Sequence, residues 1–202
     1  MPMIRIAEAT DLEQIVDVHI AAFPNFFLTL LGHRFLKAMY RAFLLTSGSA
    51  FVVSETDGNI DGFAVGLLAS SDPDWYAALR FFPSFALALI IALITNPIVI
   101  ISRIVAKFFS DKERVSIPSN AMILRSIGVR PENQGKGTAK NLIVIFEKIA
   151  KTRNATSVAL TTDADNNDRA IRFYSKLGYE PVQKFRQSKS RSMLLLIKNL
   201  AL

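Results

Sequence analysis

This chain of 202 residues contains no cysteine and only two histidines, His19 and His33. Without cysteine it can form no disulfide, no thiolate metal site and no acyl-thioester on a protein sulfur. Two histidines are too few to favour a metal site, and we expect each to be a surface or partly buried residue of a helix. The sequence therefore predicts chemistry that needs neither a metal nor a cysteine nucleophile.

Several other features are missing as well. The first residues, Met-Pro-Met-Ile-Arg-Ile, lack the apolar run of a signal peptide, so we expect a cytoplasmic protein. The sequence shows no internal repeat and no low-complexity tract. A hydrophobic content of 50% is enough for a substantial core, and the length predicts a single domain over residues 1–202.

Charge is divided unevenly along the chain, although the net value is +7. Residues 1–101 carry five Lys and Arg against nine Asp and Glu, whereas residues 102–202 carry 19 against eight. A basic half suits a phosphate-bearing ligand, a nucleic acid or an anionic membrane surface. We expect no nucleic-acid partner, because the basic residues are scattered and no nucleic-acid-binding motif is present.

The most informative segment runs from Ile127 to Ala139 and predicts a strand end, a turn, a glycine-rich loop and the start of a helix. Backbone N–H groups in such a loop, together with the positive end of the helix dipole, bind phosphate oxygens. The spacing does not fit a P-loop, which needs four residues between its glycines. It does not fit the dinucleotide fingerprint Gly-x-Gly-x-x-Gly either, because position 140 is lysine.

A second segment, Asn167 to Tyr179, predicts a helix that begins with capping residues and ends at Gly178. Its apolar side chains fall on one broad face at helical spacing. Tyr174 lies on that face, where a tyrosine is most often a core residue.

Taken together, the two segments resemble the GNAT superfamily of acetyl-CoA-dependent N-acetyltransferases, and the resemblance is specific over about residues 121–180. It rests on matching residues in both segments: Val129, Pro131, Gln134, Gly137, Ala139, Asn167, Ala170, Tyr174, Gly178 and Tyr179. The resemblance implies an α/β (α+β mixed sheet) class and a GNAT-like acyl-CoA N-acyltransferase fold, with a central, mostly antiparallel sheet flanked by helices.

The elements predicted along the whole chain follow an order that this fold requires. One helix is expected to start at a capping box formed by Thr10 and Glu13 and to end at Pro24. Further helices are expected to cover 32–45 and 138–152, and a last one to begin at the capping residues around Asn167 and to end at Gly178. In the helix at 138–152 the inward residues are expected to be Leu142, Ile145, Phe146 and Ile149. Strands are expected at 3–7, 50–55, 60–68, 121–129, 157–162, 180–187 and 191–198.

The segment at about 71–120 departs from the family pattern, in which a short turn joins the third and fourth strands. We expect an inserted, apolar helical segment, because Arg80 is the only charge from Trp75 to Ile94. If the flanking strands share one sheet, both ends lie on one side of any membrane, and a single crossing is excluded. The segment can then pack on the core, form a homodimer through residues 75–109, dock peripherally on the inner face of the membrane, or enter it as a hairpin.

The resemblance implies acetyl-CoA as the co-substrate. Amides of the glycine-rich loop would contact its pyrophosphate, and the strand at 121–129 would pair with its pantetheine arm where the strand at 157–162 diverges. The implied cofactor-binding residues are Ile127, Gly128, Val129, Arg130, Gln134, Gly135, Lys136, Gly137, Thr138, Ala139, Asn167 and Tyr174.

The implied reaction is acetyl transfer to a primary amine, which must first lose its proton because an alkylammonium has no lone pair. Direct attack by the amine is favoured, since the chain has no cysteine for an acyl-enzyme. The resemblance places Tyr174 as the acid that protonates the departing thiolate. The base is less evident: the strand before the loop has no carboxylate, and Asp163 can act through a water or simply cap a turn.

The acceptor site is expected at the connection between the two N-terminal helices, with Phe23, Phe26, Phe27 and Thr29 as candidate contacts, although the same phenylalanines can be core residues. The acidic N-terminal half favours a cationic small-molecule amine, for example an amino sugar. Two other hypotheses remain, a protein or peptide N-acetyltransferase and a non-catalytic acyl-CoA-binding regulatory module. The missing strand carboxylate favours the second of these.

Overall fold

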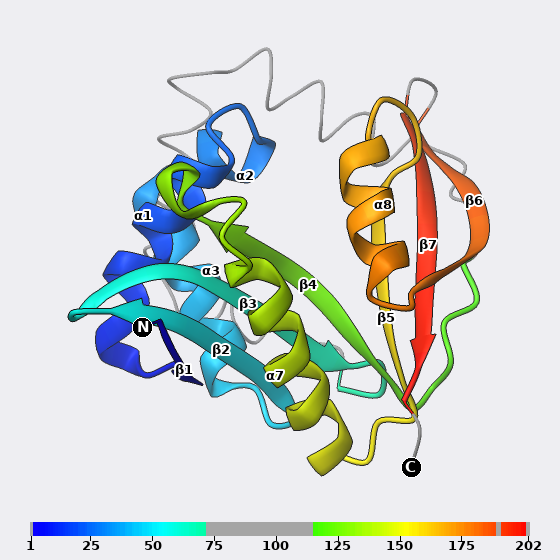
Figure 1. Ribbon diagram of the computed structural model, residues 1–202, viewed down its shortest axis with the longest axis horizontal. Coiled ribbons are helices and arrows are strands. Elements are labelled where there is room, and N and C mark those ends of the chain that lie inside the picture. Colours follow the sequence, from blue (N-terminus) through cyan, green and yellow to red (C-terminus); the bar gives the residue numbers. More distant parts are fainter. Residues whose placement is uncertain (1, 72–114, 189–190, 201–202) are drawn as a thin grey trace.

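The computed structural model describes residues 2–71, 115–188 and 191–200. Within these residues, seven strands form one sheet in the order β1-β2-β3-β4-β5-β7-β6 (Figure 1). The pair β4–β5 is parallel and the other neighbours are antiparallel. This mixed, mostly antiparallel sheet confirms the predicted fold class. The strands are β1 (Met3–Ile6), β2 (Ser49–Thr56), β3 (Asn59–Leu68), β4 (Ala121–Val129), β5 (Ser157–Asp163), β6 (Glu180–Ser188) and β7 (Arg191–Asn199).

Helices cover both faces of the sheet (Figure 1). One face carries α1 and α3, whose apolar side chains form a buried cluster with β2 and β3. The other face carries α7 and α8, which form a second cluster with β4 and β5. The helical elements are η1 (Ala9–Asp11), α1 (Leu12–Ala22), α2 (Phe27–Leu30), α3 (His33–Leu45), η2 (Pro131–Asn133), α7 (Thr138–Thr152) and α8 (Asp168–Lys176).

The start of α1 differs from the prediction of a Thr10–Glu13 capping box. The turn η1 precedes the helix, and the amide of Glu8 donates a hydrogen bond to the carboxylate of Asp11 at 2.8 Å. The predicted partner, Glu13, instead lies on the surface and pairs with Lys37. The prediction was wrong because a tertiary contact, the position of Asp11 beside β1, decides where the helix begins.

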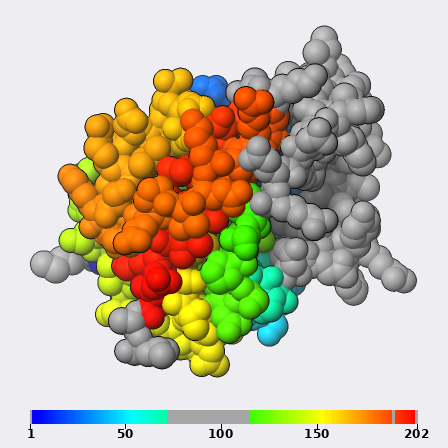
Figure 2. All heavy atoms as spheres, turned by 90° about the vertical axis from the view of Figure 1, so that its right-hand side faces the viewer, coloured from blue at the N-terminus to red at the C-terminus, as the bar shows by residue number. Residues whose placement is uncertain are grey.

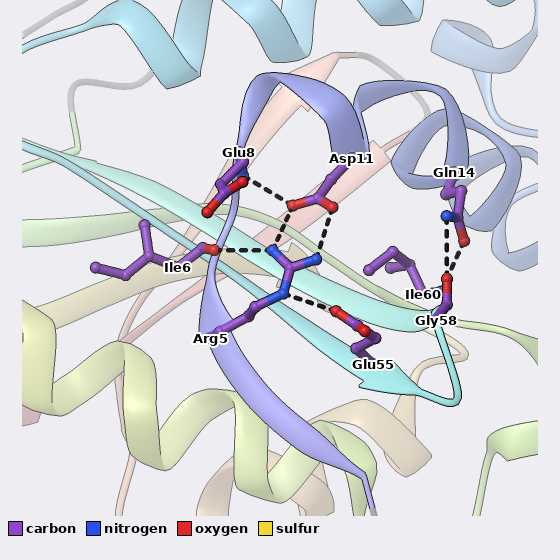
Figure 3. Close-up of polar contacts among 8 residues, drawn as sticks. All are labelled: Arg5, Ile6, Glu8, Asp11, Gln14, Glu55, Gly58 and Ile60. Carbon is purple, nitrogen blue, oxygen red and sulfur yellow. Dashed lines mark hydrogen bonds and ion pairs between the residues drawn. The ribbon is translucent and has the colours of Figure 1, made fainter.

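Arg5 is the centre of that contact (Figure 3). Its guanidinium donates to both oxygens of Asp11, at 2.7 and 2.8 Å, and to Glu55 at 2.7 Å. Burial raises the pKa of Asp11, but the hydrogen bonds from Arg5 and from the Glu8 amide outweigh it and leave that pKa below its ordinary value. The cluster therefore ties β1, η1 and β2 together and fixes the first helix on the sheet.

The helix α7 buries a face slightly rotated from the predicted one. Leu142 and Phe146 are fully buried, as predicted, whereas Ile145 and Ile149 are only partly buried. The remaining fully buried positions are taken by Ile143 and Ala150.

The end of β3 and the start of β4 lie side by side. The amide of Ala69 donates to the carbonyl of Ala121 at 2.8 Å. The flanking strands therefore share one sheet, which is the condition that excludes a single crossing between them. Most of the predicted insertion at 71–120, including the proposed dimer or membrane contact at 75–109, lies outside the described residues. In the part of the chain that the structure describes, no helix is long and apolar enough to span a membrane.

Candidate active site

The site is organised by the separation of β4 from β5. The two parallel strands pair only where Ala121–Ile123 meets Ser157–Ala159. Beyond that point β4 continues to pair with β3, and β5 continues to pair with β7, so the two strands separate toward their carboxyl ends (Figure 1). Arg125 occupies an irregularity in the β3–β4 register at the start of this separation. The predicted divergence is confirmed, and within the described residues it leaves part of the inner edge of β4 without a strand partner.

The glycine-rich loop follows β4 directly. Gly135 and Gly137 have φ angles of +77° and +87°, a conformation that favours glycine. Around a Cβ placed on either glycine, no heavy atom of the described chain lies within 4 Å, so the loop surface is open. Gly137 is the N-cap of α7, whose first-turn N–H groups have no intrahelical partner. These features fit the phosphates of acetyl-CoA, which the positive end of the helix dipole would also attract.

The loop is held from behind by β3. Arg130 donates its backbone N–H to the carbonyl of Asp61 at 2.8 Å and its Nε to the carbonyl of Ile60 at 2.9 Å. The side chain of Asn133 donates to Asp61 Oδ1 at 2.6 Å. Gln134 donates to the carbonyl of Val129 at 3.2 Å. The side chains of Arg130 and Gln134, which were expected to assist with the pyrophosphate, therefore brace the loop in this structure.

Tyr174 lies on the buried face of α8 and retains 8% of its exposure. Its ring belongs to the same large apolar cluster as Ile127, Val129 and Ala139. Burial raises the pKa of Tyr174 to about 12, so the phenol is protonated at neutral pH. A protonated phenol at this position can act as an acid.

Tyr179 holds Tyr174 in position. Its ring packs against that of Tyr174 with centroids 5.6 Å apart, and its hydroxyl donates to Glu147 at 2.9 Å. The other oxygen of Glu147 accepts from Lys198 at 2.7 Å. Gly178, with a φ of +87°, ends α8 as predicted and turns the chain into this contact.

Asp163 and Asn167 stand where β5 gives way to α8. The carboxylate of Asp163 accepts two hydrogen bonds from Arg191, at 2.5 and 2.9 Å. The side-chain amide of Asn167 donates to Thr162 Oγ1 at 2.6 Å instead of capping α8. Both side chains thus join β5 to its neighbours at the edge of the separation between the strands.

The connection predicted to bind the acceptor lies at the end of β4. Phe23 approaches Gly128 so closely that a Cβ on the glycine would meet the ring at 3.3 Å. Thr29 donates its hydroxyl to the carbonyl of Phe23 at 2.7 Å and so closes the connection on itself. Phe26 is 42% exposed, whereas Phe27 packs against the core. Of these four residues, Phe26 is the one that presents a large apolar surface to solvent.

A polar chain under the same end of β4 was not predicted. His19 Nδ1 lies 2.6 Å from the hydroxyl of Tyr40, which lies 3.2 Å from Ser126 Oγ. His19 is 2% exposed, so the expectation of a surface or partly buried histidine was wrong for this residue, and burial lowers its pKa to about 4. The sequence signal available was the position of His19 on the apolar stripe of α1. Nothing local connects it to Ser126.

The comparisons with known proteins agree with this geometry. The model of the family described as "Acetyltransferase (GNAT) family" matches residues 12–179. The ribosomal-protein-S18-alanine N-acetyltransferase of Escherichia coli is similar in structure, with a TM-score of 0.63 and 14% identity, over 100% of this chain and 96% of that one. No curated protein matches the sequence.

Two further solved structures are similar and hold a cofactor. The yncA protein of Salmonella typhimurium, solved with its cofactor acetyl-CoA, has a TM-score of 0.61 and 18% identity, over 99% of this chain and 94% of that one. The PaiA N-acetyltransferase of Thermoplasma acidophilum, solved with coenzyme A, has a TM-score of 0.61 and 15% identity, over 99% of each chain. At these identities the likeness shows the shared fold.

Proposed function

This chain belongs to the acetyltransferase (GNAT) family and is an acetyl-CoA-dependent N-acetyltransferase, and from that premise we propose that its acceptor is the primary amine of a small molecule, such as an amino sugar. The acceptor assignment is carried by the exposed ring of Phe26, and the transfer reaction by the separation of β4 from β5 beside an open glycine loop and a buried phenol. The last three features supply an edge for the pantetheine arm, a phosphate site and an acid.

In the proposed binding mode, the pyrophosphate of acetyl-CoA lies on the amides from Gly135 to Ala139. The pantetheine arm pairs with the backbone of Ile127 and Val129, with Gly128 between them, where β5 has moved away. Asn167 and Thr138 border this path from α8 and α7. Lys136, whose ammonium lies 3.0 Å from Asn133 Oδ1 at the surface, adds positive charge near the phosphates.

In the proposed chemical step, the amine nitrogen forms a bond to the carbonyl carbon of the thioester and the carbon–sulfur bond breaks. The proton of Tyr174 goes to the departing sulfur, and the nitrogen loses a proton as the amide forms. A backbone N–H near Ile127 would stabilise the oxyanion of the tetrahedral intermediate.

Asp163 stays a prediction as the base that takes the amine proton through a water. Its two hydrogen bonds from Arg191 hold the side chain in place and occupy both of its oxygens. Asp163→Asn tests the role: a base gives a lower kcat at neutral pH that recovers as the pH rises, whereas a purely structural pair gives a loss of stability and no such recovery.

For the acceptor, the exposed ring of Phe26 offers a stacking surface, with Phe23 and Thr29 shaping the connection and Phe27 anchoring it. A peptide acceptor is the second candidate, because the similar Escherichia coli enzyme is by its name a ribosomal-protein-S18-alanine N-acetyltransferase. The two candidates differ in the size of the acceptor that the connection must admit.

The test is free-thiol release from acetyl-CoA with three probes: glucosamine, spermidine and a hexapeptide that begins with alanine. We expect a small amine to give at least a tenfold higher kcat/KM than the peptide. A preference for the peptide would overturn the small-molecule assignment, and thiol release with none of the probes would count against the proposal as a whole.

Tyr174→Phe tests the acid. We expect kcat to fall about 100-fold or more, because a positioned acid contributes on the order of 10²–10⁴ in rate. Calorimetry should show acetyl-CoA affinity within about twofold of the parent protein. An unchanged kcat would show that Tyr174 is only a core residue.

A further inference from the structure

The polar chain of His19, Tyr40 and Ser126 links three elements to the end of β4. It starts in α1, passes through α3 and ends on the strand that borders the proposed active site. His19 and Tyr40 are almost completely buried, with 2% and 0% exposure, whereas Ser126 is partly exposed. These hydrogen bonds thus run from a closed interior to a partly exposed serine.

The burial of His19 has no explanation in packing alone. Its Nδ1 faces Tyr40, but its Nε2 is buried without a hydrogen-bond partner among the described residues. Burying an unpaired polar atom is unfavourable, and an apolar side chain would fill the same place between Phe23 and Phe63 without that cost. A function that needs the imidazole explains why it is there.

The direction of the hydrogen bonds follows from the chemistry of the three groups. A neutral imidazole has one acceptor nitrogen, and a phenol O–H is a better proton donor than an imidazole N–H. At 2.6 Å, the short contact therefore fits the hydroxyl of Tyr40 donating to Nδ1 of His19. The oxygen of Tyr40 then accepts the hydroxyl proton of Ser126, and the oxygen of Ser126 is left to accept from something else.

Ser126 is placed to face an acceptor amine. It immediately precedes Ile127, whose backbone borders the proposed thioester position, and its side chain points to the face that carries α1 and α3. Two residues further on, Phe23 packs over Gly128 on that same face. The residues predicted to bind the acceptor therefore share one side of β4 with the open end of the polar chain.

We propose that Ser126 Oγ accepts a hydrogen bond from the attacking amine, with Tyr40 and His19 as positioning residues that keep the serine hydroxyl turned away from it. The proposal rests on the proposed function and adds to it a residue that orients the acceptor. These three residues orient the amine and do not store a proton. Burial lowers the pKa of His19 to about 4, so a protonated imidazole is not stable there at neutral pH.

Steady-state kinetics with glucosamine, or with whichever of the three probes turns over fastest, test the contact. We expect Ser126→Ala and Tyr40→Phe each to raise the KM for the amine about tenfold, the value of one hydrogen bond, with kcat and acetyl-CoA affinity changed less than about threefold. The double variant should be no worse than the more impaired single variant, because both substitutions remove the same contact.

Ser54→Ala is the matched control. Ser54 is a fully buried serine of β2 whose hydroxyl has no partner among the described residues, and it lies away from β4. The KM of Ser54→Ala for the amine should match that of the parent protein. An unchanged KM in Ser126→Ala, with the parent enzyme active, overturns this inference and leaves the proposed function standing. Inactivity of the parent with every probe counts against the proposed function itself.

Nitrogen-15 NMR of the imidazole tests the direction of the hydrogen bonds without changing any of the three residues. The protein has two histidines, so His33→Gln leaves a spectrum of His19 alone. We expect the Nε2–H tautomer at pH 7. The Nδ1–H tautomer would reverse both hydrogen bonds, make Ser126 a donor and overturn the proposal even if every kinetic variant failed to fold.

Discussion

The two faces of the sheet each bury a tyrosine with polar partners, and the two networks are built differently. Under α7 and α8, Tyr179 donates to Glu147, and Lys198 takes the other carboxylate oxygen, at 2.9 and 2.7 Å. Under α1 and α3, Tyr40 contacts His19 at 2.6 Å and Ser126 at 3.2 Å. The first network is closed by a charge pair, whereas the second ends at a partly exposed hydroxyl.

The difference indicates two roles for the same kind of side chain. A network whose members all satisfy one another stabilises the fold, and here it holds α7, β7 and the turn after α8 together. A network that ends at a partly exposed serine, and that leaves a buried nitrogen without a partner among the described residues, is not built for stability alone. The comparison therefore separates a structural tyrosine from one placed for a ligand.

Removing Glu147 should have the largest effect, because it leaves a buried hydroxyl and an ammonium without their shared acceptor. We expect Glu147→Ala to lower the free energy of unfolding by about 3 kcal/mol, measured by urea denaturation. The control is Glu180→Ala, which removes an exposed carboxylate from β6 on the edge of the sheet shown in Figure 2 and should cost less than about 0.5 kcal/mol. Equal costs at the two positions would mean that the closed network does not stabilise the fold.

Lowering the pH should destabilise the fold through His19, which belongs to the second network. In the folded protein the pKa of His19 is about 4, whereas in the unfolded chain it returns to its ordinary value near 6.5. The unfolded chain therefore binds more protons in this window, and stability falls as the pH is lowered from 6.5 toward 4. We expect the free energy of unfolding to be about 2 kcal/mol lower at pH 5 than at pH 8.

The same titration with two variants identifies the residue responsible. His19→Gln should flatten the dependence between pH 5 and pH 7. His33→Gln, which removes the other histidine, is the matched control and should keep it. A slope that survives in His19→Gln would assign it to other groups.

The smallest effect should separate the two tyrosine hydroxyls directly. Tyr179→Phe removes a hydrogen bond to a carboxylate and should cost about 2 kcal/mol, whereas Tyr40→Phe removes one between neutral groups and should cost about 1 kcal/mol. The rings of Tyr40, Phe51 and Phe63 stay packed in the second variant, with Tyr40 centroids 5.8 and 5.1 Å from its neighbours. Both values come from thermal or urea unfolding, and the reverse order would contradict the assignment of the closed network as the structural one.

Much of the fold could be predicted from local patterns. The apolar runs of β2 and β3 on either side of Asp57 and Gly58 specify a hairpin, and the helical spacing before Gly178 specifies α8 and its end. The start of α1 could not be predicted in this way. It depends on Arg5 of β1, which donates hydrogen bonds to Asp11 in η1 and to Glu55 in β2.

In the candidate site, too, local patterns could be predicted and long-range contacts could not. The glycine-rich loop and Tyr174 are short-range patterns, so the sequence indicates them directly. The chain of His19, Tyr40 and Ser126 joins residues 21 and 86 positions apart, and only the packing of α1 and α3 on β4 brings them together. The bracing role of Arg130 likewise depends on β3 lying behind the loop, whereas Gln134 bonds locally to Val129 at the end of β4.

The hydrogen bond between Ala69 and Ala121 has a consequence for how this sequence can change over time. Since β3 and β4 are registered by their own ladder up to that point, whatever joins them does not set their alignment. The entropic cost of a longer connection grows slowly, by about 0.6 kcal/mol for each doubling. This end of the sheet is therefore a position where the length of the connection can change while the proposed active site, at the opposite ends of the strands, is left untouched.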